Sequence, residues 1–501
     1  MPVQPHLIAA VDMGSSSFRM IVARVEYPLG QPQIHIIDSL REPLRLGAGL
    51  SEDKILSKEA QQRALEALGR FAERLRSFHP DQVRAVATNA VRVARNGPEF
   101  IEKAQEVLGF EIDVISGIEE ARLVYTGVAH QLPLGQGKRL VVDIGGGSTE
   151  FVLGQDYEPL AMESLYVGCV TMAQKYFADG SITAKAMKSA IMEARREIVV
   201  LRRQLTEIGW THVVGSSGTS RTLSEICVSN GFCEHGLTAS AVERLKSELL
   251  AAGHVDRVKL EGIRSDRKAN LAGGLAVMAA VFEELELHEL EVSEGALRQG
   301  ILYDLIGRTE NHDMREITVS QFVSRYKIDV VHAHKVKALT EILFESACAS
   351  VKQPNKNLLL QVPLLGWTSL LHEVGLSISH NGHHKHSAYI LGKSDMPGFS
   401  KKEQAQMADW VLAHNGKLTK VAYLASEPQY WLAPMCLRLA TLFLRRREIE
   451  ALPQIELKLL PNGLSLTLPD QWLEEHPLTQ YSLEIEIDQW EKVGLKLDLH
   501  I

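Results

Sequence analysis

Two aspartates stand directly before turns rich in glycine and serine. Asp12 precedes the sequence Met-Gly-Ser-Ser-Ser at 13–17, and Asp143 precedes Ile-Gly-Gly-Gly-Ser-Thr-Glu at 144–150. Glycine lets backbone N–H groups converge on an anion because it has no Cβ. A lone glycine turn is equally well explained as a plain hairpin, but an aspartate that ends a buried strand needs a cation or donors. The two turns therefore predict phosphate-binding loops.

The segments around each turn separate these loops from better-known phosphate motifs. The first turn lies between apolar, strand-like segments at 7–11 and 18–25, and the second lies between 140–142 and 151–153. A P-loop or a dinucleotide-binding turn passes from a strand into a helix and uses the helix N-terminus. Neither turn does so, which predicts two strand-turn-strand hairpins. Two such hairpins from two similar domains resemble the actin/hexokinase/Hsp70 architecture, which uses them to bind phosphates across a cleft.

The two hairpins have the spacing of a duplicated domain. A shift of 131 residues aligns identical residues of the two turns, namely Asp12 with Asp143, Gly14 with Gly145 and Ser17 with Ser148. A third turn of small residues, at 213–219, follows another short strand. Such a turn often lies near the adenosine in nucleotide-using proteins of this architecture, although by itself it is weak evidence.

Two adjacent glutamates follow Ser116, and they need not share a role. If Ser116 is the N-cap of a helix, Glu119 stands at the third helical position and completes a capping box. Glu120 then has no capping duty, and it is the better candidate for a base that activates water. Asp143 and Glu150 flank the second turn and offer the oxygen ligands that Mg²⁺ prefers. A solvated strand position is the alternative for Glu150.

The rest of the chain predicts an α/β part followed by a helical part. Helices are expected at 58–78, at 97–108 and from about 117, with strands at 82–88 and 112–115. Long helical patterns follow from about 321, notably at 332–348 and 358–371. A hairpin is expected near the end, with strands at 455–459 and 464–468 around an Asn-Gly turn.

Composition bounds the class of protein. The 501 residues are too many for one hydrophobic core, and a formal charge of −8 argues against a general nucleic-acid binder. The five cysteines are scattered and share no metal-ligand spacing, which fits reduced thiols. With no signal peptide or membrane-length apolar run in sight, we expect a cytoplasmic protein without an integral membrane segment. The sequence leaves peripheral association with the inner membrane open.

Six motifs in a fixed order resemble those of the exopolyphosphatase / guanosine pentaphosphate phosphohydrolase (Ppx/GppA) family, and the long bacterial exopolyphosphatases most of all. They occupy residues 12–19, 87–96, 116–122, 143–150, 293–300 and 371–380. The resemblance implies two actin-like (ASKHA, ribonuclease H-like) α/β domains with a cleft, an all-α HD-like domain and a small β-containing C-terminal domain. We place these domains at 1–125, 126–310, 311–445 and 446–501.

The resemblance also implies roles for single residues. Glu120 would be the catalytic glutamate, and Asp143 and Glu150 would hold Mg²⁺, with K⁺ left open as an activator. The phosphate-binding residues would be Asp12, Gly14, Ser15, Ser16, Ser17, Arg92, Gly145, Gly146, Gly147 and Ser148. The family usually has asparagine where this chain has Ser16, which puts that side-chain contact in doubt but leaves the backbone contacts intact.

The third domain resembles an HD-type helical bundle, in which a His-Asp pair and further ligands hold a metal. Here the pair is His372-Glu373, and the nearby histidines show no clear ligand pattern; they are His380, His383, His384 and His386. From the sequence we expect a domain that has lost its metal site and binds substrate or the other subunit of a homodimer.

The function expected from the sequence is Mg²⁺-dependent, processive hydrolysis of terminal phosphate from inorganic polyphosphate. Arg267, Lys268 and residues 445–447 are candidate contacts to the polyanion, with solvated surface charge as the alternative. The substrate alternative is guanosine pentaphosphate, with loss of its terminal 5′ phosphate. A kinase of the same architecture and a non-enzymatic actin-like scaffold are the remaining alternatives.

Overall fold

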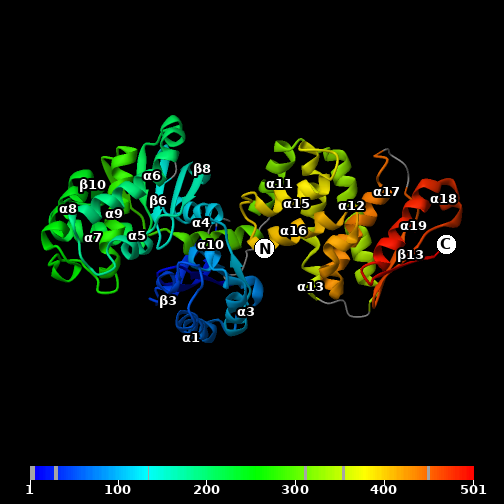
Figure 1. The fold of residues 1–501 in the computed structure, drawn as a ribbon, viewed down its shortest axis with the longest axis horizontal. Coiled ribbons are helices and arrows are strands. Elements are labelled where there is room, and N and C mark those ends of the chain that lie inside the picture. Colours follow the sequence, from blue (N-terminus) through cyan, green and yellow to red (C-terminus); the bar gives the residue numbers. More distant parts are fainter. Residues whose placement is uncertain are drawn as a thin grey trace. The chain divides into compact units, whose positions relative to one another are not determined.

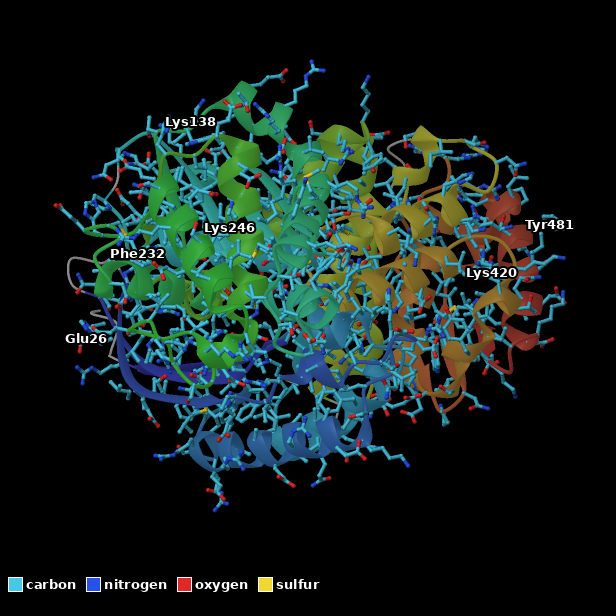
Figure 2. The ribbon with its side chains drawn as sticks, turned by 60° about the vertical axis from the view of Figure 1, so that its left-hand side comes forward. Glu26, Lys138, Phe232, Lys246, Lys420 and Tyr481 are labelled. Carbon is cyan, nitrogen blue, oxygen red and sulfur yellow. The ribbon has the colours of Figure 1, made fainter. Side chains whose placement is uncertain are left out.

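The computed structural model describes residues 6–27, 32–133, 135–309, 313–351, 356–447 and 452–500. The chain divides into two compact units, Met1–Asp313 and Met314–Ile501 (Figure 1). The first unit carries both glycine turns and both predicted α/β domains. Side chains of the first unit labelled in Figure 2 include Lys138 and Phe232, and those of the second include Lys420 and Tyr481.

The first unit contains two mixed sheets with the same strand arrangement. The five-stranded sheet has the order β3(Gln33–Glu42)-β2(Phe18–Glu26)-β1(His6–Met13)-β4(Val83–Ala87)-β5(Ile112–Val114). The six-stranded sheet has the order β10(Leu237–Thr238)-β11(Glu289–Val292)-β9(His212–Gly215)-β6(Lys138–Ile144)-β7(Thr149–Gln155)-β8(Glu158–Leu165). In each sheet the strand that ends in the key aspartate pairs antiparallel with the next strand and parallel with a later one.

The duplication predicted from the two turns is therefore visible in the topology, and the strand register extends it. Asp12 pairs with Arg19 across the first hairpin, and Asp143 pairs with Glu150 across the second. The same 131-residue shift that relates the aspartates also relates Arg19 to Glu150. The two hairpins thus share a backbone plan but carry opposite charges at one equivalent position.

Two helices form a layer between the sheets, α4 (Gly117–Ala129) and α10 (Leu297–Thr309). They share one core with apolar residues from both sheets, including Ala10 and Val141. The outer face of the first sheet is covered by α1 (Lys58–Leu75) and α3 (Gly97–Leu108). The outer face of the second is covered by α5 (Cys169–Tyr176), α6 (Ala184–Ile208), α7 (Gly218–Ser229), α8 (Ala239–Ala252) and α9 (Leu271–Leu285).

The local sequence explains these helices well. In α1, buried residues recur three and four positions apart, and the side chain of Ser57 caps the helix by accepting a hydrogen bond from the backbone of Ala60. The predicted helix at 97–108 coincides with α3, and the predicted strands at 82–88 and 112–115 are β4 and β5. The helix predicted at 58–78 ends three residues earlier, at Leu75.

Helices α4 and α10 pack backbone against backbone. A Cβ added at Gly127 would lie 2.2 Å from the carbonyl oxygen of Ala296, and one added at Gly300 would lie 1.7 Å from that of Leu123. Any side chain at these two positions would push the helices apart. Glycine is therefore required here for close approach and not for an unusual backbone angle.

A buried charge network ties the same two helices to the first sheet. Arg122 of α4 donates two hydrogen bonds of 2.8 Å to Glu119 and also contacts Asp304 of α10. Arg84 of β4 contacts Asp304 and Glu119. Burial alone would raise the pKa of Asp304, but the Arg122 and Arg84 guanidinium groups hold it well below its usual range.

The second unit is mainly helical and ends in a small sheet. Its longer helices are α11 (Met314–Arg325), α12 (Val330–Ala349), α14 (Val362–Leu371), α15 (His383–Lys393), α16 (Lys401–Ala413) and α17 (Pro428–Phe443). They are followed by β12 (Glu456–Leu460), β13 (Gly463–Thr467), α18 (Asp470–Glu475), α19 (Pro477–Glu491) and β14 (Lys496–His500). Side chains of this C-terminal part share one core with the helices, including Trp490 with Trp410 and Trp431.

The second unit confirms one prediction from the sequence and contradicts another. The hairpin at its end is confirmed, because β12 and β13 pair antiparallel around the Asn-Gly turn. The helix predicted at 358–371 is wrong as a single element, since α13 (Lys356–Leu359) and α14 are separate. Pro363 explains the break, because proline lacks an N–H and its ring clashes with the preceding helical turn. Among the described residues, none of the helices combines the length and apolar composition that a membrane crossing requires.

The buried network yields a stability prediction. Asp304→Asn should lower the free energy of unfolding by about 3–5 kcal/mol, because it removes one of the two carboxylates that the buried Arg84 and Arg122 guanidinium groups share. Urea denaturation of the full chain measures the change. Glu207→Gln removes an exposed ion pair with Arg203 on α6 and should cost less than about 1 kcal/mol. Equal losses in the two variants would contradict the role given to Asp304.

Candidate active site

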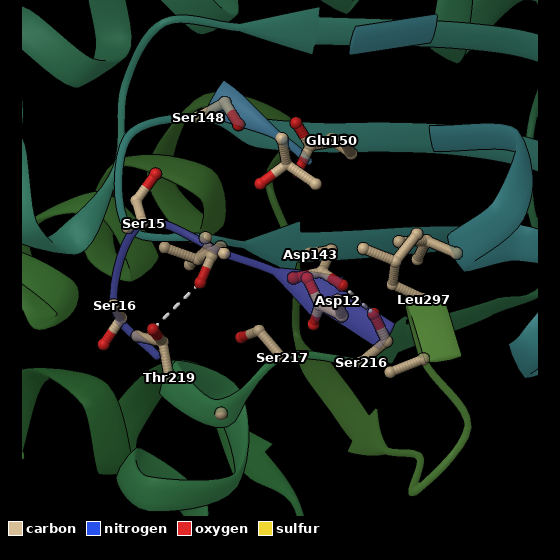
Figure 3. Close-up of a pocket in the computed structure, with 18 of the residues that line it drawn as sticks. Asp12, Ser15, Ser16, Asp143, Ser148, Glu150, Ser216, Ser217, Thr219 and Leu297 are labelled. Carbon is tan, nitrogen blue, oxygen red and sulfur yellow. Dashed lines mark hydrogen bonds between the residues drawn. The ribbon is translucent and has the colours of Figure 1, made fainter. Parts of the chain in front are cut away.

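The two glycine turns line one pocket in the first unit. The pocket is open to solvent, and the space within it and its mouth is about 790 Å³. Its walls come from both hairpin turns, the start of α4, residues 216–221 and the start of α10. Figure 3 shows Asp12, Asp143 and Ser216 lying together, with hydroxyls from both turns around the same space. All of the predicted site residues except Arg92 line this pocket.

Close contacts explain the three consecutive glycines of the second turn. A Cβ at Gly147 would lie 2.4 Å from Oδ1 of Asn89, and one at Gly146 would lie 3.0 Å from Cβ of Ser15. The turn is closed by a 2.9 Å hydrogen bond from the Gly145 N–H to the Ser148 carbonyl. These glycines let the second turn approach the first half of the unit, so the two turns touch across the pocket.

The first turn is held from the opposite side. Ser15 Oγ accepts a 3.1 Å hydrogen bond from the backbone of Ala90, and the Ser15 carbonyl accepts one of 2.8 Å from Gly47. Ser15 and Ser17 are buried, whereas Ser16 is partly exposed. The short helix α2 (Asn89–Val93) therefore fixes the first turn and contributes Asn89 to the pocket wall.

The start of α4 presents Glu120 to the pocket. The predicted N-cap is confirmed, because Ser116 Oγ accepts a 3.1 Å hydrogen bond from the Glu119 N–H, while the return bond from the Glu119 side chain that would complete a capping box stays a prediction. Glu119 has a further duty that the sequence did not indicate, since its carboxylate binds Arg122 in the buried network. Glu120, one residue later, lines the pocket and lies 9% exposed. Two adjacent glutamates thus serve the scaffold and the pocket separately.

Arg92 lies behind Glu120. Its guanidinium donates hydrogen bonds of 3.0 Å to Glu120 Oε2 and of 3.0 Å to the carbonyl of Ile115. Burial raises the pKa of Glu120 to about 7 even though Arg92 opposes the shift, and the nearby Asp12 and Asp143 carboxylates add to it. The structure thus shows Arg92 orienting Glu120, and its role as a phosphate contact stays a prediction.

Three further carboxylates of the pocket also have raised pKa values. Burial raises the pKa of Asp12 to about 6, against the opposing charges of Arg298 and Arg19. Burial raises the pKa of Asp143, although Ser216 donates a 2.8 Å hydrogen bond to it. The pKa of Glu150 lies well above its usual value because of burial and the negative charges of Glu120 and Asp143. A bound cation would therefore stabilise the ionised forms of these carboxylates.

The predicted metal ligands fit such a charge. Oδ1 of Asp12 is buried and has no hydrogen-bond partner among the described residues. Asp143 and Glu150 lie at paired positions of one hairpin, beside this oxygen in the same pocket. Among the described residues, however, no three cleft carboxylates bring their oxygens within 4.8 Å of one another. Mg²⁺ keeps several waters and shares its remaining positions with phosphate oxygens, so a Mg²⁺ site does not require three protein oxygens this close together.

Four arginines complete the pocket wall, and the sequence indicated only one of them as a ligand contact. They are Arg19, Arg221, Arg267 and Arg298. Burial and the charge of Arg298 lower the pKa of Arg19 to about 9, and burial likewise lowers those of Arg267 and Arg298. Arg19 and Arg298 lie within two of the six family motifs, and this position could have identified them as site residues from the sequence. Arg221 follows the third turn and carried no signal of its own.

The third turn differs from the first two. It leads from β9 into helix α7, whose N-cap is Ser217, and Ser216 contacts Asp143. Thr219 lines the pocket and donates a 2.9 Å hydrogen bond to the Ile144 carbonyl (Figure 3). This turn therefore belongs to the pocket. Lys268 does not line it, and of residues 445–447 the structure shows Arg447 contacting Asp329 and Glu373 in the second unit.

Comparison with known proteins identifies the family. Residues 21–309 match the Ppx/GppA phosphatase family, and residues 314–487 match the Ppx/GppA phosphatase domain III. The chain belongs to the Ppx/GppA phosphatase family. It is 36% identical over 99% of both chains to the guanosine-5′-triphosphate,3′-diphosphate pyrophosphatase of Vibrio atlanticus, and 35% identical over 99% of both chains to that of Vibrio cholerae.

Solved structures of Ppx/GppA proteins share the fold. A family member from Aquifex aeolicus is 26% identical with a TM-score of 0.51, and it covers 62% of this chain and 100% of that one. An exopolyphosphatase from Cytophaga hutchinsonii is 24% identical with a TM-score of 0.54, over 60% and 98% of the two chains. The predicted fold class is confirmed, with two actin-like α/β domains, a helical domain and a small β-containing C-terminal part. Membership in this family makes the chain a phosphoanhydride hydrolase and not the kinase or scaffold also considered.

The contact between Arg92 and Glu120 yields a pH prediction. A carboxylate must be ionised to accept a proton, so kcat/KM for phosphate release should fall as the pH is lowered through about 7. Arg92→Gln removes the positive charge that favours ionised Glu120, and the acid limb should then move to higher pH. The exposed neighbour Arg95 supplies a control, since Arg95→Gln should leave the limb in place. Identical profiles for wild type and Arg92→Gln would contradict this assignment.

Proposed function

We propose that this chain removes the terminal 5′ phosphate of guanosine 5′-triphosphate 3′-diphosphate, leaving the 5′-diphosphate 3′-diphosphate. The observation that carries the proposal is the match over 99% of both chains to proteins named for activity on this nucleotide. This substrate was the alternative in the sequence-based prediction, and inorganic polyphosphate was the main expectation. The full-length relatives favour the nucleotide.

The arginines of the pocket support a substrate with several phosphate groups. Arg19 and Arg298 lie near each other and near Arg41, and their mutual repulsion adds to the cost of burying them. Phosphate oxygens relieve such repulsion and accept bidentate hydrogen bonds from guanidinium groups. A highly charged anion bound at this wall would supply the missing negative charge.

The roles of the hairpins follow from phosphoryl transfer, which depends on positioning and on neutralising charge. The N–H groups of Gly146, Gly147 and Ser148, with Ser15 and Ser17, would bind oxygens of the terminal phosphate, while the Gly145 N–H closes the turn by its bond to the Ser148 carbonyl. Glu120, held by Arg92, would orient the attacking water and accept its proton. The phosphoanhydride bond breaks as the water oxygen bonds to phosphorus, and the departing diphosphate takes the electron pair.

Mg²⁺ is the cofactor that we propose for this pocket. Asp143 and Glu150 would hold it directly or through water, and the unpartnered Oδ1 of Asp12 faces the same space. A bound Mg²⁺ would neutralise charge on the phosphate oxygens. The homodimer and the use of K⁺ stay predictions.

Long-chain inorganic polyphosphate remains the second candidate substrate. An exopolyphosphatase-like protein of known structure is 26% identical to this chain with a TM-score of 0.54, over 61% of this chain and 100% of that one. The pocket wall of arginines and backbone N–H groups carries no feature that requires a guanine base. Both substrates end in the same phosphoanhydride, so the same chemistry serves either.

Glu120→Gln tests the base. The change keeps the size of the side chain but removes its capacity to accept a proton, so kcat should fall by about 10²- to 10⁴-fold with little change in KM. Steady-state phosphate release from the nucleotide measures both constants. Glu102→Gln, on the exposed face of α3, should behave as wild type. An unchanged kcat in Glu120→Gln would remove Glu120 from the mechanism.

A direct comparison of substrates tests the specificity. The purified protein should show a higher kcat/KM for guanosine 5′-triphosphate 3′-diphosphate than for long-chain polyphosphate at equal Mg²⁺ and equal salt. Salt must be matched because contacts between arginines and phosphates weaken steeply as salt rises. A higher kcat/KM for polyphosphate would instead establish the second candidate.

A further inference from the structure

The second unit gathers histidines that the phosphate pocket does not use. His332 lies in the first turn of α12, His372 directly follows α14, and His414 directly follows α16. Their exposed fractions are 6%, 2% and 4%. The ring centroids of His332 and His372 lie 6.0 Å apart, and those of His372 and His414 lie 5.4 Å apart. Three helices thus bring imidazoles together in a place that water hardly reaches.

Hydrogen bonds fix the tautomer of two of these rings. Nδ1 of His372 lies 2.7 Å from the Ser369 carbonyl, and Nδ1 of His414 lies 2.5 Å from the Val411 carbonyl. A carbonyl oxygen can only accept, so Nδ1 carries the hydrogen in each ring and Nε2 presents a lone pair. Histidines that bind metal ions nearly always have this arrangement, with the second ring nitrogen donating to a carbonyl or carboxylate.

The ring of His332 differs from the other two at Nδ1. This atom is buried and has no hydrogen-bond partner among the described residues. A buried ring nitrogen without a partner costs free energy. Burial also lowers the pKa of His332, and it lowers that of His372 to about 4, so both rings are neutral at physiological pH. Neutral imidazole is the form that binds metals.

Glu373 supplies an anionic oxygen beside the two rings. One ligand atom each from His332, His372 and Glu373 all lie within 4.8 Å of one another, and no other group of this kind occurs in the described part of the chain. Bonds of about 2.0–2.2 Å in the tetrahedral geometry of zinc place two ligand atoms about 3.3–3.6 Å apart. The ligand atoms must therefore come closer by about 1 Å, which side-chain rotations can supply.

Arg447 contacts the same carboxylate through Oε1, the oxygen that lies 4.0 Å from Nε2 of His372, and its positive charge adds to the effect of burial in lowering the pKa of His332. Its guanidinium lies 2.5 Å from Oε1 of Glu373 and 3.3 Å from Asp329, and its side chain is 41% exposed. A carboxylate has two oxygens and about four acceptor positions, so it can bind an ion and a guanidinium together. Carboxylates that bind metals are usually hydrogen-bonded in this way.

We propose that His332, His372 and Glu373 form a binding site for a divalent transition-metal ion, for which Zn²⁺ is the best match. Two imidazole nitrogens and one carboxylate oxygen suit zinc, whereas Mg²⁺ and Ca²⁺ prefer oxygen ligands throughout. Three protein ligands leave a coordination position for water or a small anion. The proposal differs from the sequence-based expectation that the helical domain has lost its metal site, and it is independent of the substrate proposed for the first unit.

Metal analysis of the full-length protein tests the site. The protein is stripped with a chelator and then equilibrated with limiting Zn²⁺ in excess Mg²⁺, which occupies sites made only of oxygen ligands. Mass spectrometry of the bound metal should give about one zinc per chain, and zinc should raise the melting temperature. Co²⁺ in place of Zn²⁺ should give visible absorption bands of a site with few ligands. Absence of stoichiometric zinc would overturn the proposal.

Three variants locate the ion. His332→Ala and Glu373→Gln should each weaken zinc binding by more than about 10-fold, which is the lower end of the loss for an outer partner of a metal site. Glu373→Gln preserves size and the contact with Arg447, so its fold should be intact and its melting temperature should no longer respond to zinc. His334→Ala removes an exposed histidine of the same helix and should bind zinc as wild type.

The exposed or half-exposed histidines near α15 provide the competing location. They include His380 and His383, whose rings lie 6.2 Å apart. Zinc that is lost in His383→Ala but kept in Glu373→Gln would place the ion there and overturn the assignment to His332, His372 and Glu373. Zinc kept in His383→Ala and lost in Glu373→Gln supports it.

Discussion

Helices α4 and α10 pack against each other at Gly127 and Gly300 and are joined by the buried carboxylate of Asp304. Both sheets of the first unit pack against these two helices. Among the described residues, the core that this helical layer forms takes apolar side chains from both sheets, including Ala10 and Val141. Glu120 lies on the first turn of α4, beside a glutamate of the charge network. The position of the proposed base thus follows from the packing of α4 against α10, and any side chain at Gly127 or Gly300 would displace it.

The charged side chains of the pocket lower the stability of the folded protein. Four carboxylates and four arginines face one small space, and burial acts against the charge of both kinds. Nearby opposite charges offset only part of this cost, as the raised pKa of Asp12 and the lowered pKa of Arg298 show. A protein that kept such a pocket for structure alone would do better with apolar side chains. The imbalance makes sense for a site whose ligand brings both phosphate and metal charges.

Most of the correct predictions from the sequence concern features that depend on residues close together in the chain. The hairpins, α3 and the Ser116 cap depend on neighbours along the chain, and all were found. Contacts between distant segments were missed. Arg298 reaches Asp12 only after α10 returns to the first sheet, and β14 pairs in parallel with β13 after two intervening helices. His332 and His372 lie 40 positions apart on different helices, so no spacing rule could join them.

The two hairpins share their strand pairing and register, and they differ in charge at one pair of equivalent positions. Arg19 and Glu150 occupy equivalent places in the register, so the corresponding corners of the cleft are cationic on one side and anionic on the other. A symmetric cleft would receive a linear chain of phosphates equally well in either direction. A cleft with opposite charges on its two sides binds the chain better in one direction than in the other. The same difference in charge would give a polymeric or nucleotide substrate a defined leading end.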